Sequence, residues 1–327
     1  MLTTCYRCVI FVKHPKTQGL QRHSSIFEFS ADKRTVVTIG TFDGVHKGHQ
    51  ELLSRLRTIA QDQDLESVLV TFFPHPRMVL QPDHDLKLIN TINERAGLLE
   101  KHGLHHLVVH PFSVEFSRTT AHDFVKDLLV DQLNVQVVVI GYDHRFGRNR
   151  TASITEMQEY GEQYDFEVIP VDKQQVDAIT VSSTKVRRAL QAGDLEKANQ
   201  LLGYPFMLNG EVIHGKKLGR TLGYPTANLE LDAAYKLVPA HGIYISRARI
   251  DGNWLPAMTN IGTNPTVGGT RQSIETNILN WEGDLYGQNL EVQLLHRLRE
   301  EARFNSREEL ITAMHRDLAN TRAYFDQ

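Results

Sequence analysis

Five short apolar runs mark the first half of the chain, at residues 36–39, 68–73, 107–109, 135–140 and 166–171. Between these runs, apolar residues recur at helical spacing, as at Ile92, Ala96 and Leu99. This periodicity predicts amphipathic helices between the apolar runs. Continuous apolar strands that alternate with helices are typical of a parallel sheet covered on both faces. The first half is therefore predicted to be an α/β domain with a Rossmann-like parallel sheet.

Further helices are predicted from periodicity and from capping signals. Apolar residues at helical spacing occur within residues 121–129. Ser153 is followed three residues later by Glu156, which matches a capping box that opens another helix. Two more helical stretches, residues 183–191 and 194–202, are separated at Gly193. These segments complete the helices expected in the first half.

The pattern changes after residue 203, where glycine and proline become frequent and strands dominate. In residues 290–299, every second position is expected to face the core, and most of the residues between them are polar. The expected inward positions are Leu290, Val292, Leu294, His296 and Leu298. Period-two alternation marks a sheet with one buried face. The second half is therefore predicted to be an antiparallel β-barrel.

A last helix is predicted from a capping box formed by Ser306 and Glu309. Its inner face is expected to carry Leu310, Met314 and Leu318. Together these patterns divide the chain into an N-terminal extension at residues 1–21, a first domain at 22–203 and a second domain at 204–327.

The extension contains the only two cysteines of the chain, Cys5 and Cys8. Their C-x-x-C spacing, with His14 and His23 downstream, matches no common zinc module. Two free thiols in a reducing compartment are therefore expected rather than a zinc site.

Composition narrows the class of protein. The 327 residues suffice for two domains with separate cores, and 41% hydrophobic with 23% charged residues describe an ordinary soluble globular protein. The net charge of −3 gives no basic field of the kind that attracts nucleic acid. No apolar run approaches the length that spans a bilayer, and the run at 8–12 is too short for a signal peptide. A cytoplasmic protein without nucleic-acid or membrane partners is expected, and the sequence indicates no particular protein partner.

The most informative segment is VVTIGTFDGVHKGH at residues 36–49, which is typical of a buried strand, a glycine-rich turn and the start of a helix. His46 and His49 are three residues apart, so both imidazoles point the same way in the first helical turn. That turn also carries unpaired backbone N–H groups and the positive end of the helix dipole. The three glycines of the turn let the backbone approach a ligand closely. The segment therefore suits chemistry in which negative charge develops on a phosphate oxygen.

Two alternatives for these histidines are weaker. Metal ligation lacks a third Cys, His or carboxylate at a metal-site offset nearby. Ordinary surface histidines would not require the surrounding glycines. The segment is also not a P-loop, because G-x-x-x-x-G-K-[ST] occurs nowhere in the chain. Phosphate chemistry is the preferred interpretation.

Further candidates follow other predicted strands, because ligands of an open parallel sheet bind beyond the carboxyl ends of its strands. Asp143 and Arg145 come after the fourth apolar run. They could bind the polar parts of a nucleotide or flavin, or form a salt-bridged loop. Phe112, Phe116 and Phe124 follow the third run and could wall a flat aromatic ring, with core packing as the alternative for Phe124.

A second phosphate cradle is predicted where Ser182, Ser183 and Thr184 open a helix. Hydroxyls and backbone N–H groups at a helix start, with the Arg187 guanidinium in the first turn, favour an anion. The alternative is a plain serine N-cap, which is equally common.

The second half holds another candidate site. Residues 215–228 interleave glycines with basic residues, which can bring backbone donors against polyphosphate, although a structural hairpin with a proline turn is the alternative. Thr226 and Asn228 offer side-chain oxygens that suit Mg²⁺, whose other ligands are waters and substrate phosphates. Glu275 lies in a strand that is otherwise apolar-alternating. It is either a general base or an exposed strand residue.

Taken together, these segments resemble the bacterial bifunctional riboflavin kinase/FAD synthetase family, from about residue 35 to the C-terminus. Glu275 and its neighbours belong to the likeness. The other matching motifs are G-T-F-D-G-V-H-x-G-H at 40–49, T-F-x-P-H-P at 71–76, G-Y-D-x-R-F-G at 141–147, S-S-T-x-V-R at 182–187, G-R-x-L-G-Y-P-T-A-N at 219–228 and N-I-G-x-x-P-T at 260–266.

The resemblance implies two reactions. The barrel would transfer the ATP γ-phosphate to the 5′-hydroxyl of riboflavin, giving FMN, with Glu275 as the base and Thr226 and Asn228 holding Mg²⁺. The Rossmann-like domain would join AMP from a second ATP to FMN, giving FAD and pyrophosphate, with His46 and His49 stabilising charge on the ATP phosphates. An alternative is a riboflavin kinase with a non-catalytic flavin- or nucleotide-binding first domain, which the intact histidines and Arg187 argue against.

The resemblance also implies the substrate contacts. Implied nucleotide contacts are Gly40, Phe42, Asp43, Gly44, Gly48, Ser182, Ser183, Thr184, Arg187, Gly215, Lys217, Gly219 and Arg220. Implied flavin contacts are Pro74, His75, Phe112, Phe116, Asp143, Arg145 and Arg299. The expected small-molecule partners are ATP, riboflavin and FMN.

Overall fold

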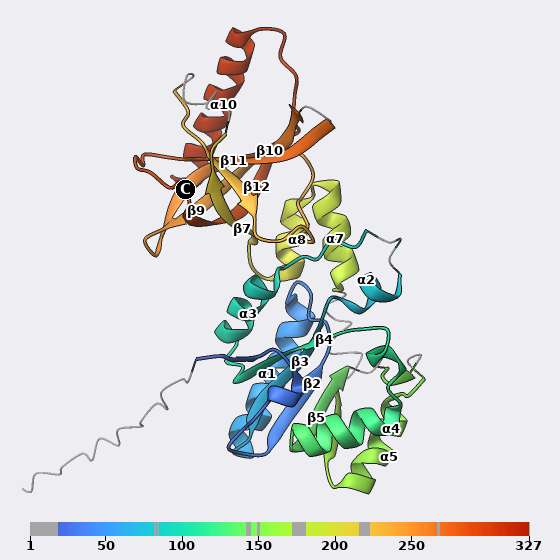
Figure 1. The fold of residues 1–327 in the computed structure, drawn as a ribbon. Helices are drawn as coiled ribbons and strands as arrows, with labels where there is room; N and C mark the ends of the chain where they lie inside the picture. Colours follow the sequence, from blue (N-terminus) through green and yellow to red (C-terminus); the bar gives the residue numbers. More distant parts are fainter. Residues whose placement is uncertain are drawn as a thin grey trace, which may run out of the picture.

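The computed structural model describes residues 19–326, apart from residues 82, 84, 142–144, 149–150, 172–180, 216–222 and 267–268. The chain forms a parallel-sheet domain and a β-barrel domain, with two helices at their junction (Figure 1). These helices are α7 (Ser183–Ala192) and α8 (Leu195–Leu202). Both predicted folds, the parallel α/β domain and the antiparallel barrel, are confirmed.

The first domain is built on a six-stranded sheet in which all neighbouring strands are parallel. The strand order is β1-β4-β3-β2-β5-β6. The chain progresses outward from β2 in one direction and from β5 in the other, so a ligand crevice is expected between these two strands. The strands are β1 (Gln21–His23), β2 (Thr35–Ile39), β3 (Glu66–Phe73), β4 (His106–Pro111), β5 (Val135–Gly141) and β6 (Glu167–Val171).

The five predicted apolar runs are strands β2 to β6, and every residue of β2 is buried. The sixth strand, β1, escapes prediction because its three residues are all polar. It pairs with β4 at the edge of the sheet and begins at Gln21, the last residue assigned to the extension. Hydrogen bonding rather than hydrophobic periodicity therefore defines this strand.

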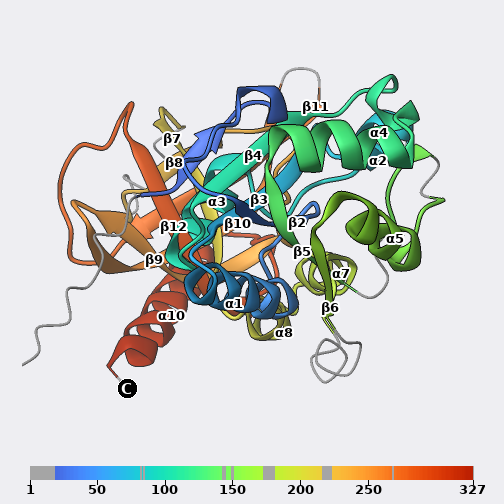
Figure 2. The same cartoon turned by 90° about the horizontal axis from the view of Figure 1, so that it is seen from below.

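Helices cover both faces of the sheet (Figure 2). Buried residues of α1 (Lys47–Asp62) and α3 (Ile92–Lys101) pack on one face. The other face is covered by α4 (Ala121–Asp123), η3 (Phe124–Gln132) and α5 (Ile154–Tyr164). Shorter helical turns are η1 (Ile26–Glu28), α2 (Pro76–Leu80) and η2 (Phe116–Arg118). No helix in the described part of the chain combines the length and apolarity that a membrane crossing requires.

Two helix predictions can be compared in detail. Ser153 and Glu156 form the predicted capping box at the start of α5. The helix predicted over residues 121–129 is present, but from Phe124 onward it is a π-helix. A π-helix has a wider turn than an α-helix. Over only nine residues this difference shifts the apolar positions too little for the sequence to distinguish the two helix types.

The second domain is a closed six-stranded antiparallel barrel with strand order β10-β11-β8-β7-β12-β9. Closure satisfies the backbone groups that an open sheet would leave at its edges. The strands are β7 (Phe206–Ile213), β8 (Ala227–Leu231), β9 (Gly242–Ile250), β10 (Asn253–Thr266), β11 (Gly269–Ile278) and β12 (Asn289–Arg299).

The alternating pattern predicted for β12 is correct only in its first half. Leu290, Val292 and Leu294 are buried in the barrel core. Register shifts follow between Leu294 and His296 and again between Arg297 and Arg299. A bulge places an extra residue in one strand and changes which side chains face the core, so His296 lies outside and pairs with Glu196.

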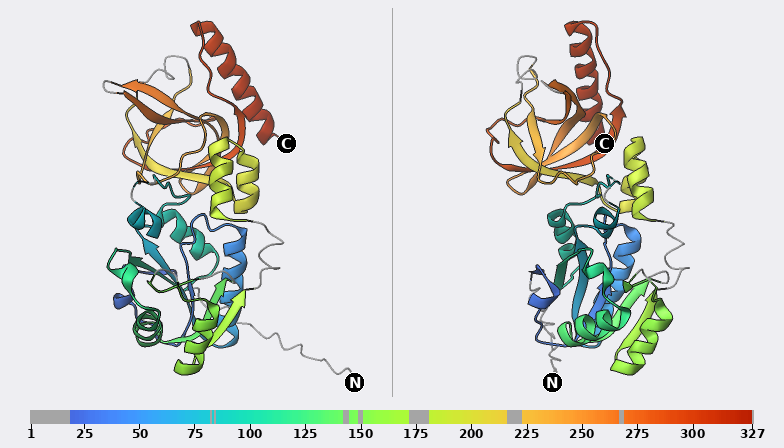
Figure 3. Two further views of the ribbon diagram at one scale, coloured as in Figure 1. Left: turned by 90° about the vertical axis from the view of Figure 1, so that its right-hand side faces the viewer. Right: turned by 45° about the vertical axis from the view of Figure 1, so that its right-hand side comes forward.

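The last helix, α10 (Arg307–Phe325), lies beside the barrel against β9 and β10 (Figure 3). Ser306 caps it by accepting the Glu309 N–H at 3.1 Å, whereas the Glu309 carboxylate accepts from the Asn305 N–H instead of closing the predicted box. The predicted inner residues Leu310, Met314 and Leu318 are half-buried. Asp317 and Thr321 are the most buried residues of this helix.

The helices at the junction pack with the barrel. Val186, Leu190, Leu195 and Leu202 of α7 and α8 belong to the same buried cluster as the inward side chains of the barrel strands. Figure 3 shows both helices against the barrel. The boundary predicted at residue 203 therefore separates elements that share one hydrophobic cluster.

Candidate active sites

A tightly wound loop connects β2 to α1. Phe42, Gly44 and Val45 have positive φ angles of 45°, 89° and 35°, a region that β-branched residues such as valine rarely adopt. Glycine is required at position 44, because a Cβ there would lie 2.9 Å from Ile89 Cδ1. Strained backbone of this kind is found at sites where it positions functional groups.

The histidines predicted to act on phosphate are stacked at the start of α1. The ring centroids of His46 and His49 are 3.7 Å apart, and Phe42 stacks on His49 at 4.4 Å. His46 Nδ1 accepts the His49 backbone N–H at 3.4 Å as the helix cap. The neutral His46 ring therefore carries its proton on Nε2. Gly48, between the two histidines, is buried.

Burial keeps the histidines of this region neutral at pH 7. It lowers the pKa of His46 to about 4, with Arg187 adding to the effect and Asp43 opposing it. Burial also lowers the pKa of His49 well below its usual value, assisted by His46 and Arg95. The pKa of His75 is likewise lowered to about 4 by burial. Neutral rings offer N–H donors, and the negative charge of a bound triphosphate would raise their pKa.

These shifts predict lower stability in acid. The pKa of His46 and His75 is about 4 in the folded protein, against 6.5 for an ordinary histidine. Between these pH values the unfolded chain binds protons that the folded protein does not, so stability falls as pH drops from about 6.5 to about 4. Each histidine contributes up to about 3 kcal/mol to this loss. Urea unfolding at pH 7, 6 and 5 measures it.

His75→Asn provides a matched variant for this measurement. His75 Nδ1 accepts the Arg77 N–H at 3.1 Å as the cap of α2, and asparagine is also a good N-cap. The variant should keep the helix start but lose one titrating group. We expect a shallower loss of stability below pH 6.5, and a slope equal to that of the wild type would contradict the assignment.

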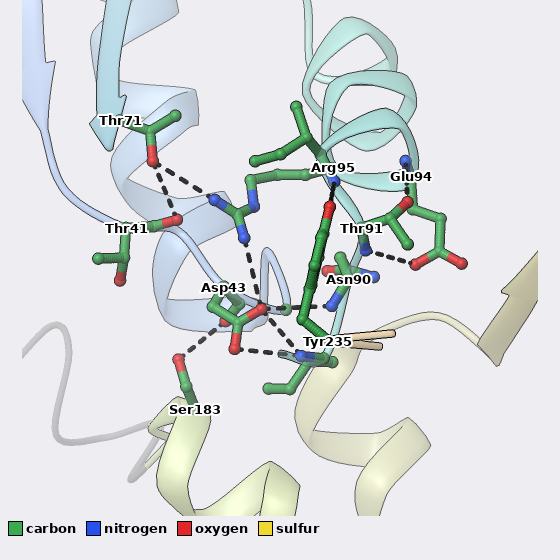
Figure 4. A network of polar contacts seen from close by, with 12 residues as sticks. Thr41, Asp43, Thr71, Asn90, Thr91, Glu94, Arg95, Ser183 and Tyr235 are labelled. Atoms are coloured by element: carbon green, nitrogen blue, oxygen red, sulfur yellow. Dashed lines mark hydrogen bonds and ion pairs between the residues drawn. The ribbon is translucent and has the colours of Figure 1, made fainter. Parts of the chain in front are cut away.

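Asp43 is fully buried and surrounded by protein donors (Figure 4). Its carboxylate accepts the backbone N–H groups of Ile89 and Asn90 at 2.9 and 3.2 Å. Arg187 Nη2 donates to it at 2.8 Å, and Arg95 Nη2 lies 3.6 Å away. The side chain implied as a nucleotide contact is thus engaged with the protein, where it holds the Arg187 guanidinium in place.

Arg95 is a residue of this site that the hydrophobic pattern does not reveal. Its side chain is 2% exposed, and Nη1 donates to Thr71 Oγ1 at 3.4 Å. Thr71 in turn donates to the Thr41 carbonyl at 3.2 Å (Figure 4). Arg95 Nε and Nη2 have no hydrogen-bond partner among the described residues. The only signal in the sequence is a cation beside the apolar positions of α3.

The start of α7 lies against the same loop. Ser182 Oγ caps the helix by accepting the Lys185 N–H at 3.3 Å. Ser183 Oγ donates to the Asp43 carbonyl at 2.8 Å, and Thr184 is exposed. The starts of α1 and α7 therefore meet beyond the carboxyl end of β2, and two motifs far apart in the chain lie side by side.

The implied flavin contacts of this domain lie after β3 and β4. Pro74 is exposed, and His75 starts α2. Phe112 and Phe116 are half-buried, with ring centroids 5.9 Å apart and both next to Phe72. Both rings are partly accessible, and Phe116 also packs against the hydrophobic cluster on this face of the sheet, in which Phe124 is buried. Arg145 is exposed, and Asp143 lies outside the described residues.

The second predicted site lies on the outer face of the barrel. Glu275 of β11 is directly opposite Asn228 of β8, so the two side chains share one face with Cβ atoms about 5 Å apart. The neighbouring Ile274 and Thr276 are buried in the barrel interior, as alternation along a strand requires. Thr226 precedes β8, and its carbonyl accepts from Asn228 Nδ2 at 3.5 Å. The three predicted residues therefore converge.

Two other implied contacts have structural partners in the barrel. A Cβ at Gly215 would clash with Asn228 Nδ2, so a larger residue there would force the Asn228 side chain to move. Arg299 forms a two-pronged ion pair with Asp317 of α10, including Nη2 to Oδ2 at 2.7 Å. It anchors the last helix in the structure. Lys217, Gly219 and Arg220 lie outside the described residues.

No group of three or more His, Cys, Asp or Glu side chains that could hold a metal ion occurs among the residues that the structure describes. The oxygen donors near Glu275 are a hydroxyl, an amide and a carboxylate, which are hard ligands suited to Mg²⁺. The predicted extension with Cys5 and Cys8 lies almost wholly outside the described range.

Comparison with known protein families gives two matches that divide the chain between the two sites. The FAD synthetase family model matches residues 28–185, and the riboflavin kinase family model matches residues 202–325. The first match contains His46, His49 and Asp43, and the second contains Asn228 and Glu275.

Curated relatives match almost the whole chain. A bifunctional riboflavin kinase/FMN adenylyltransferase from Listeria monocytogenes is 38% identical, over 90% of this chain and 93% of its own length. Proteins of the same name from Escherichia coli and Pseudomonas fluorescens are 36% and 39% identical, over 89% and 88% of this chain and 92% of each relative.

A solved structure also aligns over nearly the full chain. It is a protein from Streptococcus pneumoniae called a macrolide-efflux protein, with a TM-score of 0.82 and 32% identity, covering 93% of this chain and 98% of its own. That name differs from the names of the sequence relatives. The two family matches agree with the names of the sequence relatives.

Proposed function

This chain belongs to the bifunctional riboflavin kinase/FMN adenylyltransferase family, and we propose that it converts riboflavin to FAD in two ATP-dependent steps at separate sites. The barrel domain phosphorylates riboflavin to FMN. The parallel-sheet domain joins AMP to FMN and releases pyrophosphate. The observation that carries this proposal is a pair of separate side-chain arrangements that suit phosphate chemistry: stacked histidines at a helix start and a carboxylate opposite an asparagine on the barrel.

In the adenylyl-transfer step, a phosphate oxygen of FMN attacks the α-phosphorus of ATP, and the bond to the bridging oxygen of pyrophosphate breaks. The His46 and His49 rings and the N–H groups at the start of α1 face the developing negative charge. Arg187, held by Asp43 at 2.8 Å, adds a fixed positive charge. No covalent intermediate on the protein is needed, because positioning and charge stabilisation suffice.

In the kinase step, the 5′-hydroxyl oxygen of riboflavin attacks the γ-phosphorus of ATP, and ADP leaves. Glu275 accepts the hydroxyl proton. Thr226 and Asn228 provide the oxygens that would hold Mg²⁺, which when bound neutralises charge on the ATP phosphates. The pairing of Glu275 with Asn228 in the strand register keeps the base next to these oxygens.

Product analysis of the purified protein tests the proposal. Riboflavin, ATP and Mg²⁺ should give FMN first and FAD later, whereas FMN with ATP should give FAD and pyrophosphate directly. FMN accumulation without FAD would instead support a kinase whose first domain only binds flavin or nucleotide. Formation of neither product would refute both assignments.

A further inference from the structure

A buried ion pair joins the two domains. Lys236, in the connection between β8 and β9, and Glu94 of α3 have side-chain exposures of 0% and 1%. Lys236 Nζ lies 2.6 Å from Glu94 Oε2 and also donates to the Ile89 carbonyl at 2.7 Å. Neither side chain has a part in the two reactions described above. A buried ion pair adds little net stability. Stability alone therefore does not explain why Lys236 and Glu94 are buried at this junction.

The barrel domain holds residues 88–94 at further points. The backbone of Leu88 exchanges two hydrogen bonds of 2.7 Å with residues 235 and 237. Tyr235 Oη accepts the Ile92 N–H at 3.3 Å. Asn209 of β7 donates to Glu94 Oε1 at 3.0 Å. Lys236 and Asn209 thus bind both carboxylate oxygens of Glu94, and Thr91 N–H also donates to Oε2 at 2.9 Å.

The opposite side of this segment holds the phosphate site. The N–H groups of Ile89 and Asn90 bind the Asp43 carboxylate, three residues before His46. Figure 4 shows Asp43 between this segment and Ser183, with Tyr235 alongside. Tyr204, which precedes the first barrel strand, donates to the Gly44 carbonyl in the same loop at 2.5 Å. Residues 88–94 therefore connect the barrel to residues 40–49, which we call the histidine loop.

We infer that Lys236, although it belongs to the barrel domain, is a positioning residue for adenylyl transfer in the parallel-sheet domain. The inference rests on the proposed function. Lys236 fixes the carbonyl of Ile89, and the N–H of Ile89 fixes Asp43. Asp43 in turn fixes Arg187, whose charge acts on His46. If Lys236 no longer holds Ile89, Asp43 becomes less well fixed and the Arg187 guanidinium moves away from the position in which it would bind the ATP phosphates.

The test compares Lys236→Met with Lys87→Met. Lys87 is the matched control because its Nζ crosses the same junction, donating to the Ala234 carbonyl at 3.1 Å, yet its side chain is 39% exposed. For Lys236→Met we expect the KM for ATP in FAD formation to rise about 10-fold or more, with riboflavin phosphorylation within about two-fold of the wild type. Lys87→Met should change neither reaction.

A second variant separates positioning from folding. Lys236→Met/Glu94→Gln removes both buried charges, so its unfolding midpoint should return towards that of the wild type. The Ile89 carbonyl still lacks its donor, so the raised KM for ATP should persist. Recovery of both quantities, or an equal loss of the two activities in Lys236→Met, would overturn the inference and leave Lys236 a stabilising residue only.

Hydrogen exchange provides a readout that does not depend on turnover. Amides of residues 88–94 should exchange faster in Lys236→Met than in the wild type, and ATP should protect residues 40–49 less well in the variant. If the wild type formed no FAD, the proposed function would fail while these exchange rates still decided the role of Lys236. Unchanged exchange in both peptides would refute the positioning role.

Discussion

Glu275→Ala is expected to lower the rate of FMN formation from riboflavin by about 10²–10⁴-fold, because the attacking hydroxyl loses the base that accepts its proton. The conversion of added FMN to FAD should continue at the wild-type rate, since the histidine loop lies in the other domain. Separate assays with riboflavin and with FMN measure the two effects. The prediction derives from the register that sets Glu275 opposite Asn228.

Glu230→Ala is the control for this prediction. Glu230 lies two residues beyond Asn228 on the same face of β8, and it is exposed. Its replacement should leave both activities within about two-fold of the wild type, because substitution of an exposed side chain that has no part in the proposed reaction usually has a small effect. If Glu230→Ala reduced FMN formation as strongly as Glu275→Ala, the rate loss would reflect damage to the strand rather than loss of a base.

His49→Ala is expected to reduce FAD formation from FMN by on the order of 10²-fold or more, while riboflavin phosphorylation persists. The ring of His49 stacks on those of His46 and Phe42. Its removal takes away one donor and also leaves the His46 ring without its stacking partner. Most of the loss should appear in kcat, because the leaving pyrophosphate carries more negative charge in the transition state than in bound ATP.

His102→Ala controls for the loss of a partly buried histidine. His102 follows α3, and burial lowers its pKa as it does for His49, but the charged neighbour that acts on it is Arg57 rather than a residue of the proposed site. Wild-type FAD formation is expected in this variant. Equal losses of both activities in His49→Ala would show that the two sites are not independent, or that the substitution unfolds the protein.

The sequence predicts the parallel sheet well because its central strands are apolar on both faces. β2, β3 and β5 are short runs of mostly buried, apolar residues, a pattern that a strand buried on both faces explains most simply. β1 carries none, since three polar residues at a sheet edge obtain their structure from hydrogen bonds to β4. The prediction fails in the second half of β12, because a bulge after Leu294 changes which side chains point into the barrel.

The site shows the same division between local and long-range information. Motif spacing predicts that His46 and His49 lie together, and the sequence indicates Thr226 and Asn228, two residues apart, as oxygen donors. Nothing local predicts that Arg95 lies beside Asp43 or that Lys236 reaches Glu94. Both contacts join residues distant in the chain, and an isolated arginine or lysine on a predicted surface resembles any solvated cation.

The packing of α7 and α8 limits how this protein can be cut into working halves. A fragment ending at residue 203 would keep Ser183 and Arg187 but expose the apolar faces that now lie against the barrel. A fragment starting at α7 would keep those faces covered and deprive the sheet domain of its guanidinium. We therefore expect a cut on either side of these two helices to impair one of the two domains, because α7 and α8 contribute to both.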